Sequence, residues 1–540
     1  MNPFQRLRLI QPCLVALALS CPMTHSDDTP LLTCLDSTTD IHLLNKKNTS
    51  DADYKRQQAL SEKVGLALSG GGSRALVLLE ALSQFMQPEY KTEISRFSAS
   101  SGGAWAITAT LMHSPKKVEA FLGSPNIELN KLYWDDTEKT PAENNIAQLK
   151  GDRLASVAQH LGYYSAALSF FLWRHFPFIF PGYKGWEEYL SYALLERFDL
   201  KPDAKLAPAA FPGLTNKGEL IINAYLKGQH EEKIPIEMTP EWVGGAITSF
   251  KEGAYTLPPC GFNRDIKEQK LSCSNDYCEV KLGEGKGLTV ANAMATTGAN
   301  YVDTIPFSYF PPEFQYPEPN LQEKTIKSSS RMFADSGNED YVSIMPLLRR
   351  GQKKIIAFVH TDIPLKHTPK KTGGTGIIGM DKVIPSYFGI IPDESAEKKF
   401  YQPDTHIHQQ DCSVLSSRNK VFGDAHYQPL AEALWKAKEN GKPIVYKQTG
   451  LTTLKNDCYG IPGGEKVDII WIYNDLPENW FQTHLPALVG KIKADKDFDL
   501  FPHYGFKELY LKPPVANLMV ALAKWTIDET QYIWRPFFED

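Results

Sequence analysis

The segment Val64-Gly-Leu-Ala-Leu-Ser69, which runs directly into Gly70-Gly71-Gly72, decides the fold. A short apolar run that ends in glycines predicts a buried strand. Residues 74–86 follow with helical spacing and without glycine or proline, so they predict a helix. The segment is therefore a strand, a glycine turn and a helix.

The same pattern repeats immediately, with a strand at 94–98, a turn of small residues at 99–103 and a helix at 104–113. Further apolar runs predict strands at 219–224, 354–361 and 467–473. Strands that alternate with helices predict an α/β fold with three layers, in which helices cover both faces of a mostly parallel central sheet.

The aromatic, irregular stretch at about 115–215 predicts a cap inserted into an α/β domain that spans residues 61–535. Its segment 163–186 holds ten aromatic residues, which either pack in the core of the cap or form a surface that meets lipid. Arg174, His175 and Pro177 interrupt this segment, so it is not a transmembrane helix.

The composition is that of a globular protein. Of 540 residues, 42% are hydrophobic and 22% are charged, which excludes a disordered chain, a collagen-like fibre and a coiled coil. The net charge is −5 and no basic blocks occur, so we expect no nucleic-acid partner.

The N-terminus predicts an export signal at 1–20, because Arg6 and Arg8 precede the apolar core 14–19. Cys21 follows directly, which allows a lipidated N-terminus. Residues 21–60 form a polar lead-in. We therefore expect an exported protein of the periplasm or outer membrane, or a secreted one.

Six cysteines remain beyond Cys21, and in an exported protein they permit up to three disulfides. Cys273 and Cys278 could close a small loop together or could each pair elsewhere. A zinc site is less favoured because their C-x4-C spacing has no second matching pair. The six are Cys34, Cys260, Cys273, Cys278, Cys412 and Cys458.

The glycine turn places backbone N–H groups at a helix N-terminus, where they can stabilise a phosphate or an oxyanion. No nucleotide-binding glycine motif is present. A purely structural tight turn is the alternative.

The second turn resembles a nucleophile elbow, because a serine flanked by small residues sits where a strand gives way to a helix. Ser101 has Ala99 and Gly103 at the flanking positions, and a register centred on Ser100 fits more loosely. A serine hydroxyl needs a base, and Asp335 is the best acidic candidate since it ends the apolar segment 331–334 just before a glycine.

These pieces together resemble the catalytic module of the cytosolic phospholipase A2 and phospholipase B family, which is related to patatin-like phospholipases. The family's glycine loop followed by arginine resembles Gly70 to Arg74, and its Ser-Gly-Ser-Thr-Trp segment resembles Ser101 to Trp105. The Trp105 match favours Ser101 over Ser100. The family's Asp-Ser-Gly and the basic turn after it resemble Asp335 to Arg350.

The resemblance implies a Ser101–Asp335 dyad that forms an acyl-enzyme from a fatty-acyl ester of a phospholipid. Gly71 and Gly72 would stabilise the oxyanion, at about 2.7–4 kcal/mol per donor. Arg74 would lie near the lipid phosphate. The family implies no metal and no cofactor, and its partner is a phospholipid membrane or micelle surface.

Two alternatives stay open. One is a Ser–Asp–His triad that adds His360 or His426. The other is a lipid-binding protein that keeps the fold without activity.

Overall fold

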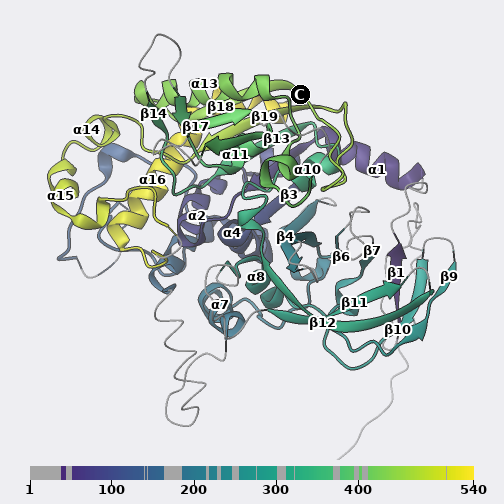
Figure 1. The fold of residues 1–540 in the computed structure, drawn as a ribbon. Helices are drawn as coiled ribbons and strands as arrows, with labels where there is room; N and C mark the ends of the chain where they lie inside the picture. The colour runs from purple at the N-terminus through teal and green to yellow at the C-terminus, as the bar shows by residue number, and fades with distance from the viewer. Residues whose placement is uncertain are drawn as a thin grey trace, which may run out of the picture.

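The sheet and its helices are seen in a computed structural model (Figure 1). It describes residues 38–43, 51–138, 140, 142, 144–162, 185–214, 218–227, 233–245, 255–274, 277–300, 312–320, 323–368, 377–393, 400–403, 411–505 and 508–539. The predicted signal at 1–20, Cys21, and all but the last two residues of the aromatic segment lie outside the described residues. In the described part, no helix is long and apolar enough to cross a membrane.

The centre of the sheet is parallel, as predicted. Five neighbouring strands, in the spatial order β19-β13-β2-β3-β4, all pair in parallel. Their bounds are β2 Val64–Leu68, β3 Ile94–Ser100, β4 Glu219–Lys227, β13 Lys354–Val359 and β19 Lys466–Tyr473. All five include a predicted strand, so the α/β prediction is confirmed.

Antiparallel strands extend this centre on both sides. Beyond β19 lies β18 (Val445–Thr452), and beyond β4 the order continues β5-β6-β7-β1-β10-β9. A hairpin of β11 and β12 joins β4 separately. The remaining bounds are β1 Thr38–Leu43, β5 Lys233–Met238, β6 Val243–Gly244, β7 Tyr255–Leu257, β8 Gln269–Lys270, β9 Ser272–Ser274, β10 Tyr277–Lys281, β11 Glu313–Asn320 and β12 Thr325–Asp335.

Along the parallel strands, successive side chains pack alternately into two separate hydrophobic cores. Leu66 and Phe358 lie in one hydrophobic cluster, whereas Ala67 and Ala357 lie in another. Since neighbouring residues of a strand point to opposite faces, the sheet is buried on both sides.

Helices cover each of these cores. The first face carries α2 Gly72–Leu78, α4 Ser101–Met112, α5 Pro115–Leu122, α7 Trp186–Leu194 and α8 Val290–Thr297. The second carries α10 Met345–Arg349, α11 Val383–Ser386 and α13 Tyr427–Glu439. The long α16 (Pro513–Glu529) packs against α2, and α1 (Asp51–Glu62) leads into β2. The three-layer prediction is confirmed.

Local details differ from the sequence prediction. The helix predicted at 74–86 begins at Gly72 and changes at Leu79–Ser83 into a 3₁₀-helix. Within the described residues of the stretch 115–215, helices and short 3₁₀ turns form but no strand of the sheet. Its role as a cap stays a prediction.

Two disulfides join described cysteines. Cys273 pairs with Cys278 across the β9–β10 hairpin, which is the small loop that the spacing allowed. Cys412 pairs with Cys458 between two loops near β18. Cys260 is disulfide-bonded as well.

Candidate active site

The turn between β3 and α4 holds Ser101 in a strained backbone conformation. Its φ is 48°, in the left-handed region that non-glycine residues seldom adopt, while Ser100 before it is extended. The Ser101 N–H donates to Thr297 Oγ1 at 2.9 Å, which anchors the turn to α8. A strained serine between a strand and a helix is the geometry of a nucleophile elbow.

Ser100 has a different environment. Its Oγ lies 2.5 Å from Ser343 Oγ and accepts a hydrogen bond from Ser336 Oγ at 2.8 Å. Its side chain is fully buried in this cluster of three hydroxyls. Ser100 therefore serves the packing of the turn, and the geometry favours Ser101 as the reactive serine.

The glycine turn after β2 lies directly against Ser101. A Cβ atom built on Gly70 would lie 3.1 Å from Ser101 Cβ, and one on Gly102 would lie 2.3 Å from the Gly72 carbonyl oxygen. Gly71 and Gly72 have φ values of 128° and 54°. Such close backbone contact beside positive φ requires glycine.

The backbone N–H groups of this turn are not all occupied. The Gly70 N–H donates to the Tyr341 carbonyl oxygen at 3.2 Å. Within the described part of the chain, the N–H groups of Gly71 and Gly72 have no recorded acceptor. They are therefore the two donors of the turn that a ligand oxygen could use.

The ends of β3 and β12, which carry Ser100 and Asp335, lie along the same edge of β4. Along β4, strand β5 pairs with residues 222–227 and so occupies one edge. Strand β3 pairs with the other edge up to Asn223, opposite Ser100, and β12 takes over at Ala224, opposite Asp335. Because β3 runs parallel and β12 antiparallel to β4, their C-terminal ends meet head-on. Ser100 and Asp335 are the last paired residues on the two sides of that meeting point, and Ser101 follows Ser100 directly.

Hydrogen bonds join the two strand ends at Asn223. Its carbonyl oxygen accepts from Ser336 Oγ at 3.1 Å and from Thr297 Oγ1 at 2.6 Å. The Asp335 carboxylate, in a side chain only 3% exposed, accepts the Gly337 N–H at 2.7 Å. The turn after β3 and the turn after β12 are thus both fixed to one residue of β4.

Arg74 lies beneath the glycine turn. Its Nε and Nη2 both donate to the His360 carbonyl oxygen, at 3.1 and 2.9 Å, and Nη2 also donates to Tyr341 Oη. A Cβ on Gly71 would come within 2.9 Å of this guanidinium. Arg74 therefore supports the turn from inside, and its expected contact with a lipid phosphate stays a prediction.

The two histidines of the triad alternative lie in different places. His360 follows β13 and is buried, and burial with the nearby Arg74 charge lowers the pKa of its imidazole to about 3. Among the described residues, its Nδ1 has no hydrogen-bond partner, so no carboxylate orients that nitrogen. His426 is exposed, and its carbonyl oxygen is bonded to Gln448 of β18, four positions along the sheet from β3. Neither histidine has the setting of a triad base.

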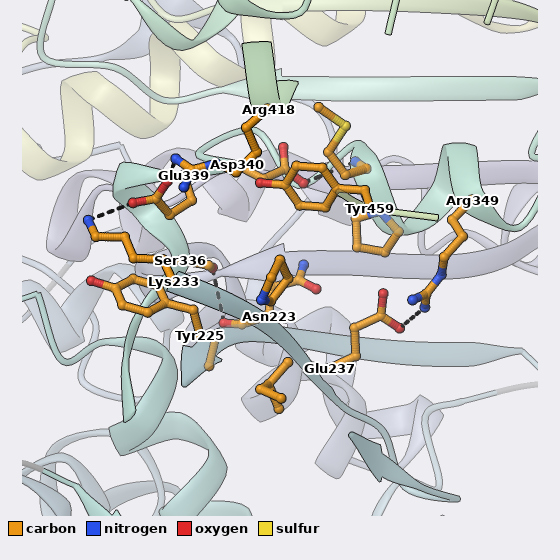
Figure 2. Close-up of a pocket in the computed structure, with 15 residues that line it drawn as sticks. Asn223, Tyr225, Lys233, Glu237, Ser336, Glu339, Asp340, Arg349, Arg418 and Tyr459 are labelled. Carbon is orange, nitrogen blue, oxygen red and sulfur yellow. Dashed lines mark hydrogen bonds and ion pairs between the residues drawn. The ribbon is translucent and has the colours of Figure 1, made fainter. Parts of the chain in front are cut away.

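A small cavity lies beside the turn that follows β12 (Figure 2). Asn223 and Ser336 belong to its wall, and so do the charged side chains of Glu339, Asp340 and Arg418. Burial raises the pKa of Asp340 to about 6 although three groups donate hydrogen bonds to its carboxylate. Ser101 and Asp335 do not line this cavity.

Sequence reasoning missed several residues that build the site. Thr297 holds the Ser101 N–H, Asn223 joins the two strand ends, and Glu339 anchors the turn after Asp335. No local motif marks them, since each acts through a partner far away in the sequence. Within the described residues, no cluster of side chains could hold a metal ion.

No protein-family model matches the chain, and no curated protein matches it significantly. Among solved structures, human GIVD cytosolic phospholipase A2 matches with a TM-score of 0.47 and 13% identity over 92% of this chain. This chain spans 65% of the human chain. The same human protein with a methyl gamma-linolenyl fluorophosphonate inhibitor and terbium chloride gives a TM-score of 0.42 at 14% identity, over 92% and 65% of the two chains.

VipD from Legionella pneumophila gives a TM-score of 0.20 at 14% identity, over 51% of this chain and 46% of that chain. TM-scores below 0.5 carry no weight for function, so the case for an activity rests on the site itself.

Proposed function

We propose that the chain is a lipid acyl hydrolase of the phospholipase A or lysophospholipase type, with Ser101 and Asp335 as a catalytic dyad. The observation that supports it most is the head-on meeting of β3 and β12 on one edge of β4. It supports the proposal because Ser101, with its positive φ, follows the end of β3, Asp335 ends β12, and the glycine turn beside Ser101 has two N–H groups without an acceptor among the described residues. These are the parts that acyl transfer needs.

The proposed reaction has two steps. Ser101 Oγ attacks the ester carbonyl carbon while Asp335 accepts its proton, and the N–H groups of Gly71 and Gly72 stabilise the oxyanion. The intermediate collapses to an acyl-enzyme as the lysolipid leaves with that proton. Asp335 then takes a proton from water, whose oxygen attacks the acyl carbon, and the fatty acid departs as Ser101 regains a proton.

The setting of this reaction is also a proposal. The substrate would be a fatty-acyl ester at a phospholipid membrane or micelle surface, and the protein would act after export. A dyad needs no histidine, which fits the settings of His360 and His426 described above. Arg74 would contribute through the glycine turn that it supports and, as the resemblance implies, near the lipid phosphate.

A fluorophosphonate probe tests the proposal most directly, because it reacts only with activated serines. We expect one labelled peptide, carrying the probe on Ser101, and fatty-acid release from phosphatidylcholine micelles. Asp335→Asn should abolish labelling, whereas His360→Ala should leave the labelling rate within a few-fold. Loss of labelling in a His360→Ala variant that remains folded would instead support a Ser–Asp–His triad.

Other results would contradict the proposal. A probe on another serine would exclude Ser101 as the nucleophile. Binding to phosphatidylcholine vesicles without labelling or fatty-acid release would identify a lipid-binding protein without activity. Parallel assays with lysophosphatidylcholine, a galactolipid and a triacylglycerol would define the substrate class.

A further inference from the structure

The turn that follows Asp335, residues 336–345, is tied to both halves of the proposed dyad, and we call it the aspartate turn. Ser336 and Ser343 bond the hydroxyl of Ser100, the residue before the proposed nucleophile. Ser343 has a φ of 68°, so this turn does not hold its shape through favourable local geometry alone. Its shape must be fixed by contacts from elsewhere.

The strongest of these contacts converge on Glu339. Its carboxylate, in a residue only 5% exposed, forms ion pairs with Arg418 and, at 2.6 Å, with Lys233 of β5. Its carbonyl oxygen accepts a hydrogen bond from Asn419 Nδ2 at 2.6 Å. Figure 2 shows Lys233 and Arg418 reaching Glu339 at the wall of the cavity. Both the side chain and the backbone of Glu339 are therefore held, four residues after Asp335.

Arg418 and Asn419 are in turn held by a second loop, residues 456–461. Asn456 Nδ2 donates to the Arg418 carbonyl oxygen at 2.6 Å, and Tyr459 Oη donates to Asn419 Oδ1 at 3.3 Å. The disulfide between Cys412 and Cys458 joins the segment before Arg418 to this loop. Arg418 Nη1 also donates to the Cys412 carbonyl oxygen at 3.4 Å.

These contacts form one chain of support. It runs from the disulfide to Arg418 and Asn419, then to Glu339, and through the aspartate turn back to Asp335. Removing the cation of a buried ion pair leaves an uncompensated buried charge, which is strongly destabilising. We therefore expect Glu339 to leave its position when Arg418 is replaced by a neutral residue. Lys233 alone is a weak substitute, because a third of its side chain is exposed to water.

From this arrangement we propose that Arg418 and Asn419 are positioning residues for Asp335, and that the Cys412–Cys458 disulfide holds them in place. The inference rests on the proposed function, in which Asp335 is the proton acceptor. Neither residue contacts the reacting atoms, so both act through the orientation of the aspartate turn. Such residues change the rate of the chemical step more than the binding of substrate.

The two disulfides provide a matched test. The double variant Cys412→Ser/Cys458→Ser should lower kcat at least tenfold with KM unchanged within about twofold, because the site is still present but misaligned. The double variant Cys273→Ser/Cys278→Ser removes a disulfide from the β9–β10 hairpin instead and should keep kcat within twofold. Thermal melts of both show whether each remains folded at the assay temperature.

Single substitutions separate positioning from general stability. Arg418→Met should lower kcat more than Arg418→Lys, which keeps a charge for Glu339, and Asn419→Asp should lower it through repulsion from the Glu339 carbonyl oxygen. Amide hydrogen exchange gives a readout that needs no substrate. Peptides covering residues 335–345 should exchange faster in Arg418→Met and in Cys412→Ser/Cys458→Ser, while peptides of β2 and β13 should not.

The outcomes distinguish this inference from the proposed function. If the wild type labels at Ser101 and releases fatty acid, but these variants match it in kcat and in exchange at 335–345, the inference is wrong and the function stands. If the wild type neither labels nor releases fatty acid, the proposed function fails. Unchanged exchange at 335–345 in Arg418→Met overturns the inference in either case.

Discussion

The two strand-to-helix turns of the parallel sheet reach similar backbone geometry with different residues. After β2, Gly71 and Gly72 adopt positive φ at little steric expense, since glycine has no Cβ. After β3, Ser101 adopts positive φ and bears the strain of its side chain. The comparison teaches that this strain is kept at Ser101, where a glycine would remove the hydroxyl, and such strain is typical of functional sites.

The largest expected effect comes from substituting each of the two neighbouring serines, Ser101 and Ser100, by alanine. Ser101→Ala should reduce fatty-acid release on the order of 10⁴-fold or more, as the loss of a nucleophile does in other hydrolases. Ser100→Ala should lose less than about tenfold, because it removes only a structural hydroxyl. Equal losses in kcat/KM for the two variants would contradict the assignment of Ser101 as the nucleophile and of Ser100 as a structural serine.

A smaller effect should follow from giving the glycine turn a side chain. Gly72→Ala adds a Cβ that would lie 2.7 Å from Leu509 Cδ2, so we expect kcat to fall by about 10²-fold as the N–H donors move. Gly351→Ala is the control, since its φ is 66° but nothing lies within 4 Å of the added Cβ. It should lower stability by roughly 1 kcal/mol and leave kcat unchanged. Steady-state kinetics and urea unfolding measure both.

The strain itself should be measurable as stability. Ser101→Gly relieves the positive φ, and we expect its free energy of unfolding to stay equal to the wild type or to rise by up to about 1 kcal/mol. Ser100→Gly breaks the hydroxyl cluster in an extended strand and should instead lose about 1–2 kcal/mol. Urea midpoints of the two variants give the result, and a large destabilisation in Ser101→Gly would show that the serine is not strained.

The last prediction concerns the pH dependence of stability, and no change in activity is expected from it. Since burial raises the pKa of Asp340 to about 6 from 3.8, the folded state retains this proton longer than the unfolded chain. Its contribution to stability is complete below about pH 4 and declines as pH rises to about 6, by roughly 2–3 kcal/mol. Asp340→Asn should remove that decline, so the gap between wild-type and variant unfolding free energies should change between pH 4 and 6 and be constant above.

The sequence predicts the fold well because its parallel strands are short apolar runs, and β2 and β3 are followed by glycine or small residues. Ser101, Asp335 and the glycine turn stand at strand ends, and strand ends are recognisable from one sequence. The antiparallel extension was not predicted, because strands such as β6 and β8 contain two residues each and show no alternation. The helix expected at 74–86 tightens after Leu78, where the packing of α16 overrides local preference.

The support of the site could not be predicted from the sequence. Arg74 binds a backbone carbonyl, that of His360, and every residue type offers such a carbonyl. The contact of Arg418 with Glu339 joins the short helix α12 (Leu415–Asn419) to the aspartate turn, and the two segments carry no common motif. The pairing of β12 beside β3 on β4 depends on the register of three strands at once.

Because both strands pair with β4, their registers on β4 set the spacing between the two strand ends of the site. Ser100 and Asp335 stand opposite consecutive residues, Asn223 and Ala224, although the strands that carry them are far apart in the chain. One extra residue inserted between these two positions would separate the pair by about 3.3 Å and turn one partner to the other face of the sheet. A chain that has assembled β2, β3 and β4 but has not yet docked β12 holds Ser101 without Asp335, and therefore lacks the proposed catalytic pair until folding is complete.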